Sequence, residues 1–442
     1  MTRLRLGAAD TFRSLRVRNF RLFFVGQGIS QIGAWLTLVA QTLLVLELTD
    51  SGLALGLLAA VQFGPVLLLG AWAGLVADRS DKRRLLMRVQ TFAMLQVFGL
   101  GALAFMDSPP LVAIYALAGA GGVATAFDNP ARRSFVVEMV PEDHVTNAVS
   151  LNSALMTGAR VVGPALAGLL VATVGYGWTF WLDGLSFIAV LTGLYLMDPA
   201  QLRAAPAQPR GKGQIRAGLR YAWSQTELRV PLLMMALLGV LAFNYQTVLP
   251  LFAKRDLGGS ELTYSLLMSV VSVGSLTGAL TAARRRDLHV RLVSVAAIAF
   301  GATMALLAVA PSQPVAYVVG VVMGFASITF MTTSTAIVQL RADPSMRGRV
   351  LALQAIVFLG STPIGGPLVG AVSERFGARW GIALGALAGI LAGAYGLLSV
   401  RRDHAARTSD AVRARSLADA ASDRGSGPVP VTTTPLQPTA GR

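Results

Sequence analysis

One stretch of the sequence, Gly74-Leu-Val-Ala-Asp78-Arg79-Ser-Asp81-Lys82-Arg83-Arg84, decides the fold. It lies between two long apolar runs, and seven of its eleven residues are Gly, Asp, Lys or Arg. The pattern predicts a short charged turn between two membrane-crossing helices. Glycine lets a helix approach its neighbour closely, and charged side chains cap and pair at helix ends. We therefore expect Gly74, Asp78, Arg79, Lys82 and Arg83 to form a gate that locks one part of a helical bundle against another.

The composition is that of a polytopic α-helical membrane protein. Hydrophobic residues make up 54% of the 442 residues and charged residues 14%, whereas soluble proteins are about one quarter charged. The chain has no cysteine and three scattered histidines, so we expect no metal site. It also lacks the sequence patterns of a phosphate-binding loop, a nucleophile elbow and a zinc protease. We expect no enzyme activity, no cofactor and no use of ATP.

Twelve apolar segments are long enough to cross a bilayer. They cover residues 20–47, 52–77, 84–106, 111–130, 147–174, 177–197, 230–252, 262–283, 291–310, 315–339, 348–373 and 379–400. The sequence thus predicts an all-α protein in five parts. These are a cytosolic N-terminal segment (1–19), a six-helix bundle (20–197), a cytosolic central loop (198–229), a second six-helix bundle (230–400) and a disordered cytosolic tail (401–442).

The basic residues predict the orientation of the chain. Of the 38 Lys and Arg residues, 33 fall in loops and tails on the side of the N-terminus. Such a bias marks the cytosolic side, and it explains the net charge of +16 without a nucleic-acid partner. With twelve spans, both termini are expected in the cytosol, with the chain in the inner or plasma membrane of the cell.

The two halves of the chain match each other at an offset of 203 residues. At that offset Arg83 falls on Arg286, Pro141 on Pro344, Gly163 on Gly366 and Pro164 on Pro367, while Gly74 lies within one position of Gly278. Several pairs at one offset indicate a duplicated six-span unit. We expect two pseudo-symmetric bundles related by an axis along the membrane normal, with a site between them.

Several motifs resemble those of the major facilitator superfamily. The charged stretch 74–83 resembles the family's loop between spans two and three, and residues 158–168 (Gly-Ala-Arg-Val-Val-Gly-Pro-Ala-Leu-Ala-Gly) resemble its Gly-Pro antiporter motif. Asn129-Pro130-Ala-Arg132, Pro141-Glu142 to Asn147 and Arg347-Gly348-Arg349-Val350 are similar to the branch of macrolide efflux proteins and the enterobactin exporter. The resemblance covers about residues 15–400 and implies the fold of that superfamily and a drug:proton antiporter.

Two departures from the family pattern bear on the gate. Asp81 stands where the superfamily usually has glycine, and Thr281 stands opposite Asp78 in the second half. The second copy of the loop therefore lacks the carboxylate. We expect the charged lock to be asymmetric.

Polar side chains inside spans are expensive unless they face the bundle interior or water. On this ground we expect substrate or coupling contacts from Gln27, Gln31, Trp35, Asn152, Arg160, Asn244, Gln246 and Gln354. Gln27 and Gln31 share one helix face, because they are four residues apart. For these two, a hydrogen bond between helices is an equally open interpretation.

Three acidic residues have different expected roles. Asp128 is a gate partner of Lys82 and Arg83 in the resembled loop, a proton-titrating group, or simply the partner of Arg132 four residues on. For Asp183, in the sixth span, we expect a structural role. Asp50, at the end of the first span, is expected to be solvated.

Gly163-Pro164 and Gly366-Pro367 are expected to bend their helices. Proline removes a backbone hydrogen bond, and glycine lets helices close up. In the resembled antiporters this bend lies where the two bundles seal.

The resemblance implies a secondary active transporter. It would export a small amphipathic molecule, such as a drug, a macrolide or a siderophore-like metabolite, by alternating access and in exchange for protons. A facilitated-diffusion carrier or importer is the second interpretation, and a non-transporting membrane receptor or scaffold is the third. The expected partners are a small-molecule substrate, protons and the lipid bilayer, and the chain is expected to be a monomer.

Overall fold

The computed structural model describes residues 11–203, 214–282 and 289–425. These residues form helices joined by short turns, because a chain inside a bilayer must satisfy its backbone hydrogen bonds internally. The long helices of the first half are α2 (Arg18–Thr49), α3 (Gly52–Arg79), α4 (Lys82–Ala104), α5 (Leu111–Glu138) and α6 (Val145–Tyr195). Those of the second half are α7 (Gln214–Ser224), α8 (Thr226–Leu241), α9 (Tyr245–Leu251), α10 (Glu261–Ala282), α11 (Val290–Ala308), α12 (Gln313–Arg341), α13 (Pro344–Phe376) and α14 (Ala378–Gly425).

Short segments of other helix types join these elements. Three of them are 3₁₀-helical: η1 (Arg13–Arg16), η2 (Glu142–His144) and η3 (Pro199–Gln201). The fourth, η4 (Phe252–Asp256), is π-helical and continues α9.

The predicted membrane spans are confirmed. Within the described residues, eleven helical segments are long and apolar enough to cross a bilayer. One of them, Glu142–Tyr195, holds two predicted spans, because Gly175 interrupts α6 with a φ of 81°. Another, Thr226–Asp256, joins α8, α9 and η4 into one crossing. The chain is therefore an all-α multi-pass membrane protein.

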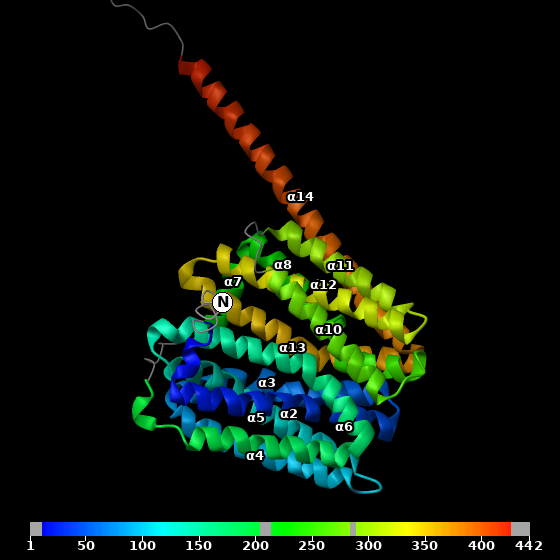
Figure 1. The fold of residues 1–442 in the computed structure, drawn as a ribbon. Helices are drawn as coiled ribbons and strands as arrows, with labels where there is room; N and C mark the ends of the chain where they lie inside the picture. Colours follow the sequence, from blue (N-terminus) through cyan, green and yellow to red (C-terminus); the bar gives the residue numbers. More distant parts are fainter. Residues whose placement is uncertain (1–10, 204–213, 283–288, 426–442) are drawn as a thin grey trace, which may run out of the picture. The chain divides into compact units, whose positions relative to one another are not determined.

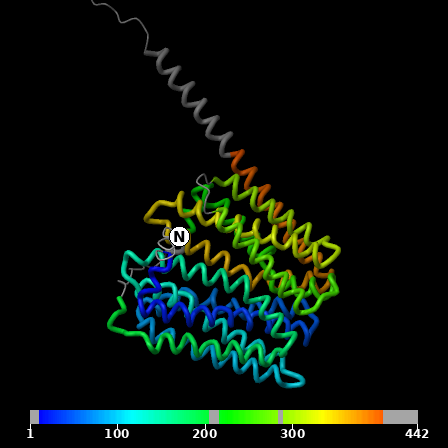
Figure 2. Tube along the Cα trace, in the orientation of Figure 1, coloured from blue at the N-terminus to red at the C-terminus, as the bar shows by residue number. Residues whose placement is uncertain are grey.

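The helices up to Leu397 form one compact unit (Figures 1 and 2). Its helices pack on one another within each half of the chain and also between the halves. In the first half α2 packs on α6, α3 on α5, and α4 on both α5 and α6. In the second half α10 and α11 pack on α12, and α8 packs on α13. The halves are joined mainly by α3 with α13 and α6 with α10, and α9 adds smaller contacts with α2 and α3.

The internal repeat is visible at equivalent points of the two halves. Pro141 precedes η2 and α6, and Pro344 is the first residue of α13. Gly74 is buried in α3 and Gly278 is buried in α10. Arg286, the expected counterpart of Arg83, lies outside the described residues.

Helix α7 lies in the segment that the sequence predicts as a central loop. Its Tyr221 hydroxyl donates to the Asp343 carboxylate at 2.8 Å and accepts from the Asp343 N–H at 3.0 Å. Ala222 joins a buried cluster with Leu228, Val338 and Val350. The α7 segment is thus tied to the second half at the start of α13.

The second unit, Leu398–Arg442, is helical as far as Gly425, whereas the sequence predicts disorder from residue 401. Composition explains the difference. Residues 401–425 are rich in Ala and Arg, which are strong helix formers, and the first proline of the tail is Pro428.

Contact between α3 and α13 depends on glycines. A Cβ at Gly56 would lie 2.3 Å from the carbonyl oxygen of Gly366, and one at Gly370 would lie 2.2 Å from that of Gly52. Real Cβ atoms do not approach backbone so closely, so only glycine fits at this spacing. The two halves therefore meet backbone to backbone near the start of α3.

We expect Gly56→Val to separate the halves at this end, because its side chain would overlap the Gly366 carbonyl. The chain has no cysteine, so spin labels on Leu48→Cys and Phe376→Cys report the separation of α2 and α13 cleanly. The distance distribution should shift to longer values in Gly56→Val. Gly64→Val is the matched control, since a Cβ there meets nothing within 4 Å. An equal shift in both variants would contradict the glycine contact.

Candidate functional site

A cavity of about 320 Å³ lies within the first half of the chain. Helices α2, α3, α4, α5 and α6 line it, and every lining residue falls between Ser30 and Phe187. The site that the sequence predicts between the two bundles stays a prediction. Along part of that boundary α3 contacts α13 and α6 contacts α10.

In the second half of the chain, a cluster of aromatic rings fills part of the interior. Phe243 lies 5.1 Å from Phe300, 5.4 Å from Phe358 and 6.5 Å from Phe330, measured between ring centroids. Such distances are typical of packed aromatic clusters. The two halves therefore share a topology but differ in what fills their interiors.

The cavity is lined by amide side chains to an unusual degree for a membrane bundle. Five glutamines reach it, namely Gln31, Gln41, Gln62, Gln90 and Gln96. Nε2 of Gln62 donates to Oε1 of Gln41 at 2.8 Å, which links α3 to α2. Trp35, Phe63 and Phe187 add aromatic surface. A wall of this kind can hydrogen-bond a solute and also pack against its apolar parts.

Asp128 forms a charged cluster at the cavity wall. Its carboxylate pairs with Arg132 one turn later on α5 and accepts from Nε2 of Gln90 at 2.6 Å. The structure thus shows the local pair that the sequence left open, and not a contact with Lys82 or Arg83. Oε1 of Gln90 and Nη1 of Arg132 are buried and have no partner among the described residues. These two atoms therefore keep unused hydrogen-bonding capacity next to the cavity.

Asp183 lines the same cavity from α6 and is 1% exposed. Thr37 on α2 donates its hydroxyl to Oδ2 at 2.6 Å, and Ser186 donates to Oδ1 at 3.0 Å. The sequence predicts a structural role for this residue. The structure places it at the cavity, held between two helices.

The other predicted contact residues divide into three groups. Gln31 and Trp35 line the cavity. Gln27 is buried, and neither of its amide atoms has a partner among the described residues. Asn152 and Arg160 lie on α6 apart from the cavity lining, with Arg160 exposed.

The remaining three predicted residues lie in the second half. Asn244 is buried and donates to the Val240 carbonyl at 2.7 Å. Gln354 is buried and donates to Ser334 at 3.3 Å. Gln246 is half-buried at the start of α9. The structure does not bring these three to the cavity of the first half.

The charged turn of α3 and α4 makes its described contacts within the first half. Lys82 pairs with the buried Glu138 of α5 at 2.5 Å. Arg83 donates to the carbonyls of Leu194 and Tyr195 at 2.6 and 2.9 Å. Breaking a buried pair such as Lys82–Glu138 typically costs about 3–5 kcal/mol. The turn therefore ties α4 to α5 and α6, and Glu138 is a partner that the sequence did not reveal.

The two Gly-Pro pairs differ in what they contact. Gly163 faces Trp35 of α2, whose Cβ would lie 2.4 Å from an added methyl group. Gly366 faces the backbone of Gly56 on α3, across the two halves. Pro164 and Pro367 lie inside α6 and α13. The second Gly-Pro pair lies at the contact between the halves, and the first packs against the cavity-lining Trp35, while a bend at either pair stays a prediction.

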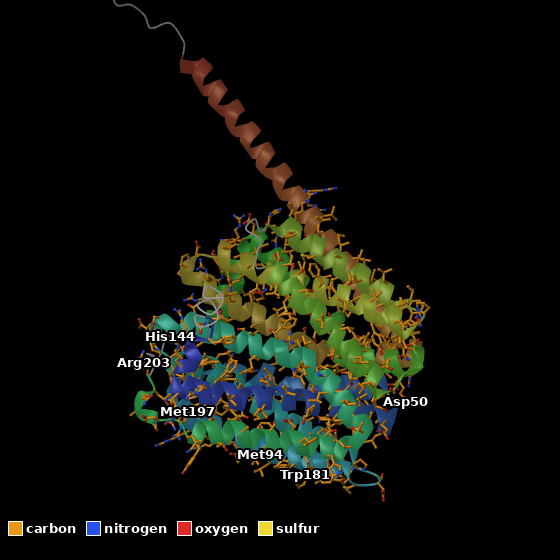
Figure 3. The ribbon with its side chains drawn as sticks, in the orientation of Figure 1. Asp50, Met94, His144, Trp181, Met197 and Arg203 are labelled. Carbon is orange, nitrogen blue, oxygen red and sulfur yellow. The ribbon has the colours of Figure 1, made fainter. Side chains whose placement is uncertain are left out.

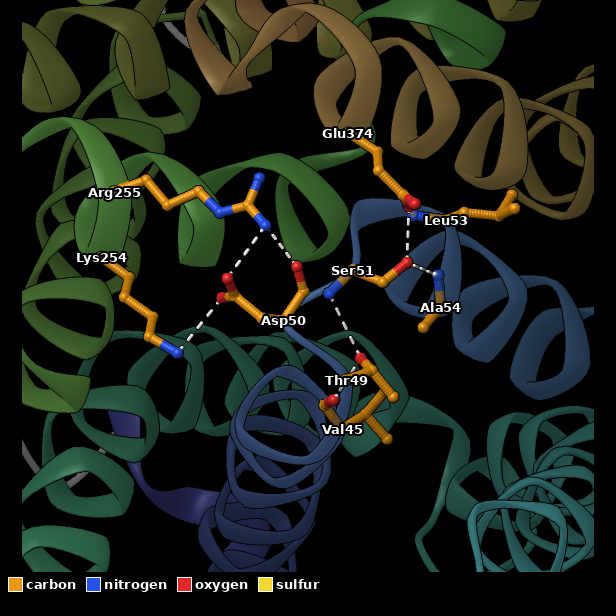
Figure 4. A network of polar contacts seen from close by, with 9 residues as sticks. All are labelled: Val45, Thr49, Asp50, Ser51, Leu53, Ala54, Lys254, Arg255 and Glu374. Carbon is orange, nitrogen blue, oxygen red and sulfur yellow. Dashed lines mark hydrogen bonds and ion pairs between the residues drawn. The ribbon is translucent and has the colours of Figure 1, made fainter.

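Polar contacts join the halves at the end of the bundle that holds Asp50 (Figures 3 and 4). Asp50 pairs with Lys254 at 3.2 Å and with Arg255 at 3.1 Å. Glu374 of α13 accepts from the Ser51 hydroxyl at 2.5 Å and from the Leu53 N–H at 2.9 Å. Asp50 is exposed, as the sequence predicts, but the fold also brings η4 to the end of α2, so the carboxylate has two basic partners that the sequence did not reveal.

Two features show how Asp50 is held. It ends α2 in the left-handed conformation, with a φ of 44°. Burial of its carboxyl works to raise the pKa of Asp50, but the hydrogen bonds and charges of Lys254 and Arg255 outweigh it and hold that pKa below its ordinary value. The carboxylate is therefore charged whenever this end is closed at neutral pH.

We expect Asp50→Asn to weaken closure at this end. The pair is about half exposed, so its loss should shift the balance between closed and open forms by no more than about fivefold, or about 1 kcal/mol. Labels on Leu48→Cys and Phe376→Cys measure the shift, and Asp107→Asn, a solvated acid at the end of α4, is the control.

Acid should have the same effect as Asp50→Asn. Because the pKa of Asp50 is lowered in the closed form, the contribution of the pair is complete above the ordinary pKa and is lost as the pH falls through the lowered one. A closed fraction that is unchanged in Asp50→Asn and in acid would contradict this role.

Comparison with known proteins finds relatives that are named as transporters or efflux proteins. The chain is 25% identical over 362 residues to the staphyloferrin A transporter of Staphylococcus aureus, covering 81% of this chain and 90% of that protein. It is 27% identical over 363 residues to the multidrug efflux pump Tap of Mycolicibacterium fortuitum, covering 78% and 87%. It is 21% identical over 375 residues to macrolide efflux protein A of Streptococcus pyogenes, covering 83% and 93%.

Solved structures share the fold. A bacterial homologue of the human lysosomal transporter Spinster, in an inward-facing and unoccupied conformation, matches with a TM-score of 0.68 at 16% identity, covering 87% of this chain and 96% of that one. The nucleoside transporter NupG matches with a TM-score of 0.68 at 17% identity, covering 87% and 99%. A family model described as "Transmembrane secretion effector" matches residues 9–434. The chain therefore belongs to the transmembrane secretion effector family of major facilitator transporters and is not an enzyme.

Proposed function

We propose that this transporter exports a small amphipathic molecule across the plasma membrane in exchange for protons. The observation that carries the proposal is the cavity of the first half, which combines five glutamines, aromatic rings and two carboxylates. Amides hydrogen-bond neutral polar groups, rings pack on apolar ones, and buried carboxylates are suited to proton exchange. Relatives named for the efflux of drugs and macrolides and for the transport of a siderophore support this substrate class.

The proposed mechanism is alternating access between the two halves. The end that holds Asp50 is joined by ion pairs and by glycine contacts, whereas the described contacts of Lys82 and Arg83 at the opposite end stay within one half. This pattern supports a form closed at the Asp50 end. The excess of basic residues at the other end supports a cytosolic location for that end and for both termini. The presence of both halves in one chain supports a monomer as the working unit.

A transport assay tests proton exchange directly. In vesicles whose membrane potential is clamped, a pH difference of about one unit drives one-for-one exchange to about tenfold accumulation. We expect erythromycin, a macrolide, to accumulate in vesicles that contain the protein and to return to the level of empty vesicles when a protonophore collapses the gradient. Equilibration that continues unchanged without a gradient would instead favour facilitated diffusion, and the absence of any uptake would remove macrolides as substrates.

We expect Asp78→Asn to abolish erythromycin transport while insertion into the membrane stays normal. Asp78 lies in the last turn of α3, where a negative charge opposes the helix dipole, so the residue is better explained by a gating role than by helix stability. Glu142→Gln, which removes an exposed acid of η2 at the same end, is the matched control. Transport at the normal rate in Asp78→Asn would remove the gate assignment.

A further inference from the structure

Asp183 has an environment unlike that of the other acids in the cavity. Its two oxygens accept from the hydroxyls of Thr37 and Ser186, both of which are neutral. Asp128, by contrast, pairs with Arg132. Among the described residues Asp183 has no ion pair. A buried carboxylate without a cation is unfavourable when charged, so it holds a proton unless another positive group replaces it.

The neighbouring helices leave room for this carboxyl group. A Cβ at Gly33 of α2 would lie 2.2 Å from Oδ1 of Asp183 and 2.4 Å from the Ser186 hydroxyl. Glycine at this position therefore lets α2 and α6 close around the acid. Thr37, one turn further on, then reaches Oδ2. The position is built by two helices and does not depend on a flexible loop.

The helices that line the cavity with Asp183 place few charged groups at it, and those groups already have partners. α5 supplies Asp128 and Arg132, which cancel each other. The cavity faces of α2, α3 and α4 supply glutamines, hydroxyls, aromatic rings and aliphatic side chains. Lys82 and Arg83 at the start of α4 are already bonded to Glu138 and to backbone carbonyls. Asp183 is thus the acid of this cavity whose charge is not balanced by the chain.

We propose that Asp183 is the carboxyl group at which a proton and a cationic substrate exchange, an inference that rests on the proposed function. When the cavity opens to the cytosol, a substrate with a protonated amine enters, the carboxyl O–H bond breaks and its proton passes to cytosolic water. The carboxylate and the ammonium group then form an ion pair among the glutamines. When the cavity opens outward, an external proton binds the carboxylate and the cation leaves, so one proton enters for each cation exported.

The first test needs no substrate. Infrared difference spectroscopy of the full-length protein in liposomes detects the carbonyl stretch of a protonated carboxyl group as the pH is raised. We expect this band in the wild type and its loss in Asp183→Asn. Ser186→Ala removes one hydroxyl donor to Asp183 and should shift the band, which identifies the band with this carboxyl group. Asp107→Asn is the matched control and should leave the band unchanged. A band that persists in Asp183→Asn would overturn the assignment.

The second test uses erythromycin, which carries a tertiary amine, at pH values where that amine stays protonated. The chain has six tryptophans, of which Trp35 lines the cavity, so the fluorescence change that is lost in Trp35→Phe reports binding there. Competition with a proton makes the wild-type affinity rise by up to about tenfold per pH unit. In Asp183→Asn we expect weak binding that does not change with pH, and wild-type pH dependence in this variant would overturn the proposal. If the wild type neither binds nor transports erythromycin, the proposed function fails for macrolides, while the infrared result still decides whether Asp183 carries the proton.

Discussion

The close approach of α3 and α13 is the constraint on which the rest of the structure depends. At Gly56 and Gly366 the two helices meet without side chains between them. In lipid the hydrophobic effect gives no preference for one apolar surface over another, so association of helices depends on such van der Waals contact and on polar groups. The same approach brings Glu374 to the first turn of α3, where it caps Leu53 and binds Ser51. Close packing and polar contacts therefore hold α3 and α13 together at the same end of this helix pair.

The two halves share a helix arrangement but differ in the side chains that fill their interiors. The first half encloses a polar cavity, and the second encloses a cluster of aromatic rings around Phe243. The cost of polar groups in a membrane explains why amides gather in one half: each can satisfy another, as Gln41 does for Gln62. One half is thus equipped to hold a solute. The other offers a well-packed body against which the first can move.

Much of the fold could be predicted from the sequence, because span length and hydropathy are local properties. The all-α fold and its membrane crossings follow from such local patterns, and the positions of Pro164 and Pro367 inside long helices could be read off in the same way. Of the residues that the sequence singles out, Gln31 and Trp35 line the cavity of the first half, and whether they contact a substrate stays a prediction. Gln62, Gln90 and Gln96 are likewise polar side chains inside apolar spans and could have been chosen on that ground.

Other features depend on contacts between distant segments and were missed. Lys82 meets Glu138, and Asp50 meets Lys254 and Arg255, only after the helices pack. The role proposed for Asp183 could not be predicted for the same reason, since it depends on the groups of α2 and α6 that surround the carboxyl group. Helix α7 was missed because its short amphipathic sequence becomes stable through packing on α13, as the Tyr221 contact with Asp343 shows.

The left-handed backbone of Asp50 has a consequence for how tightly the closed end is held. An L-residue in this conformation is less stable by about 1–2 kcal/mol, somewhat less for aspartate, than in a right-handed one. A half-exposed ion pair returns no more than about 1 kcal/mol. The backbone at φ 44° places the Asp50 carboxylate beside Lys254 and Arg255, and these half-exposed ion pairs stabilise the closed end only weakly. Contacts of this strength favour one alignment of the two halves without locking the molecule in it.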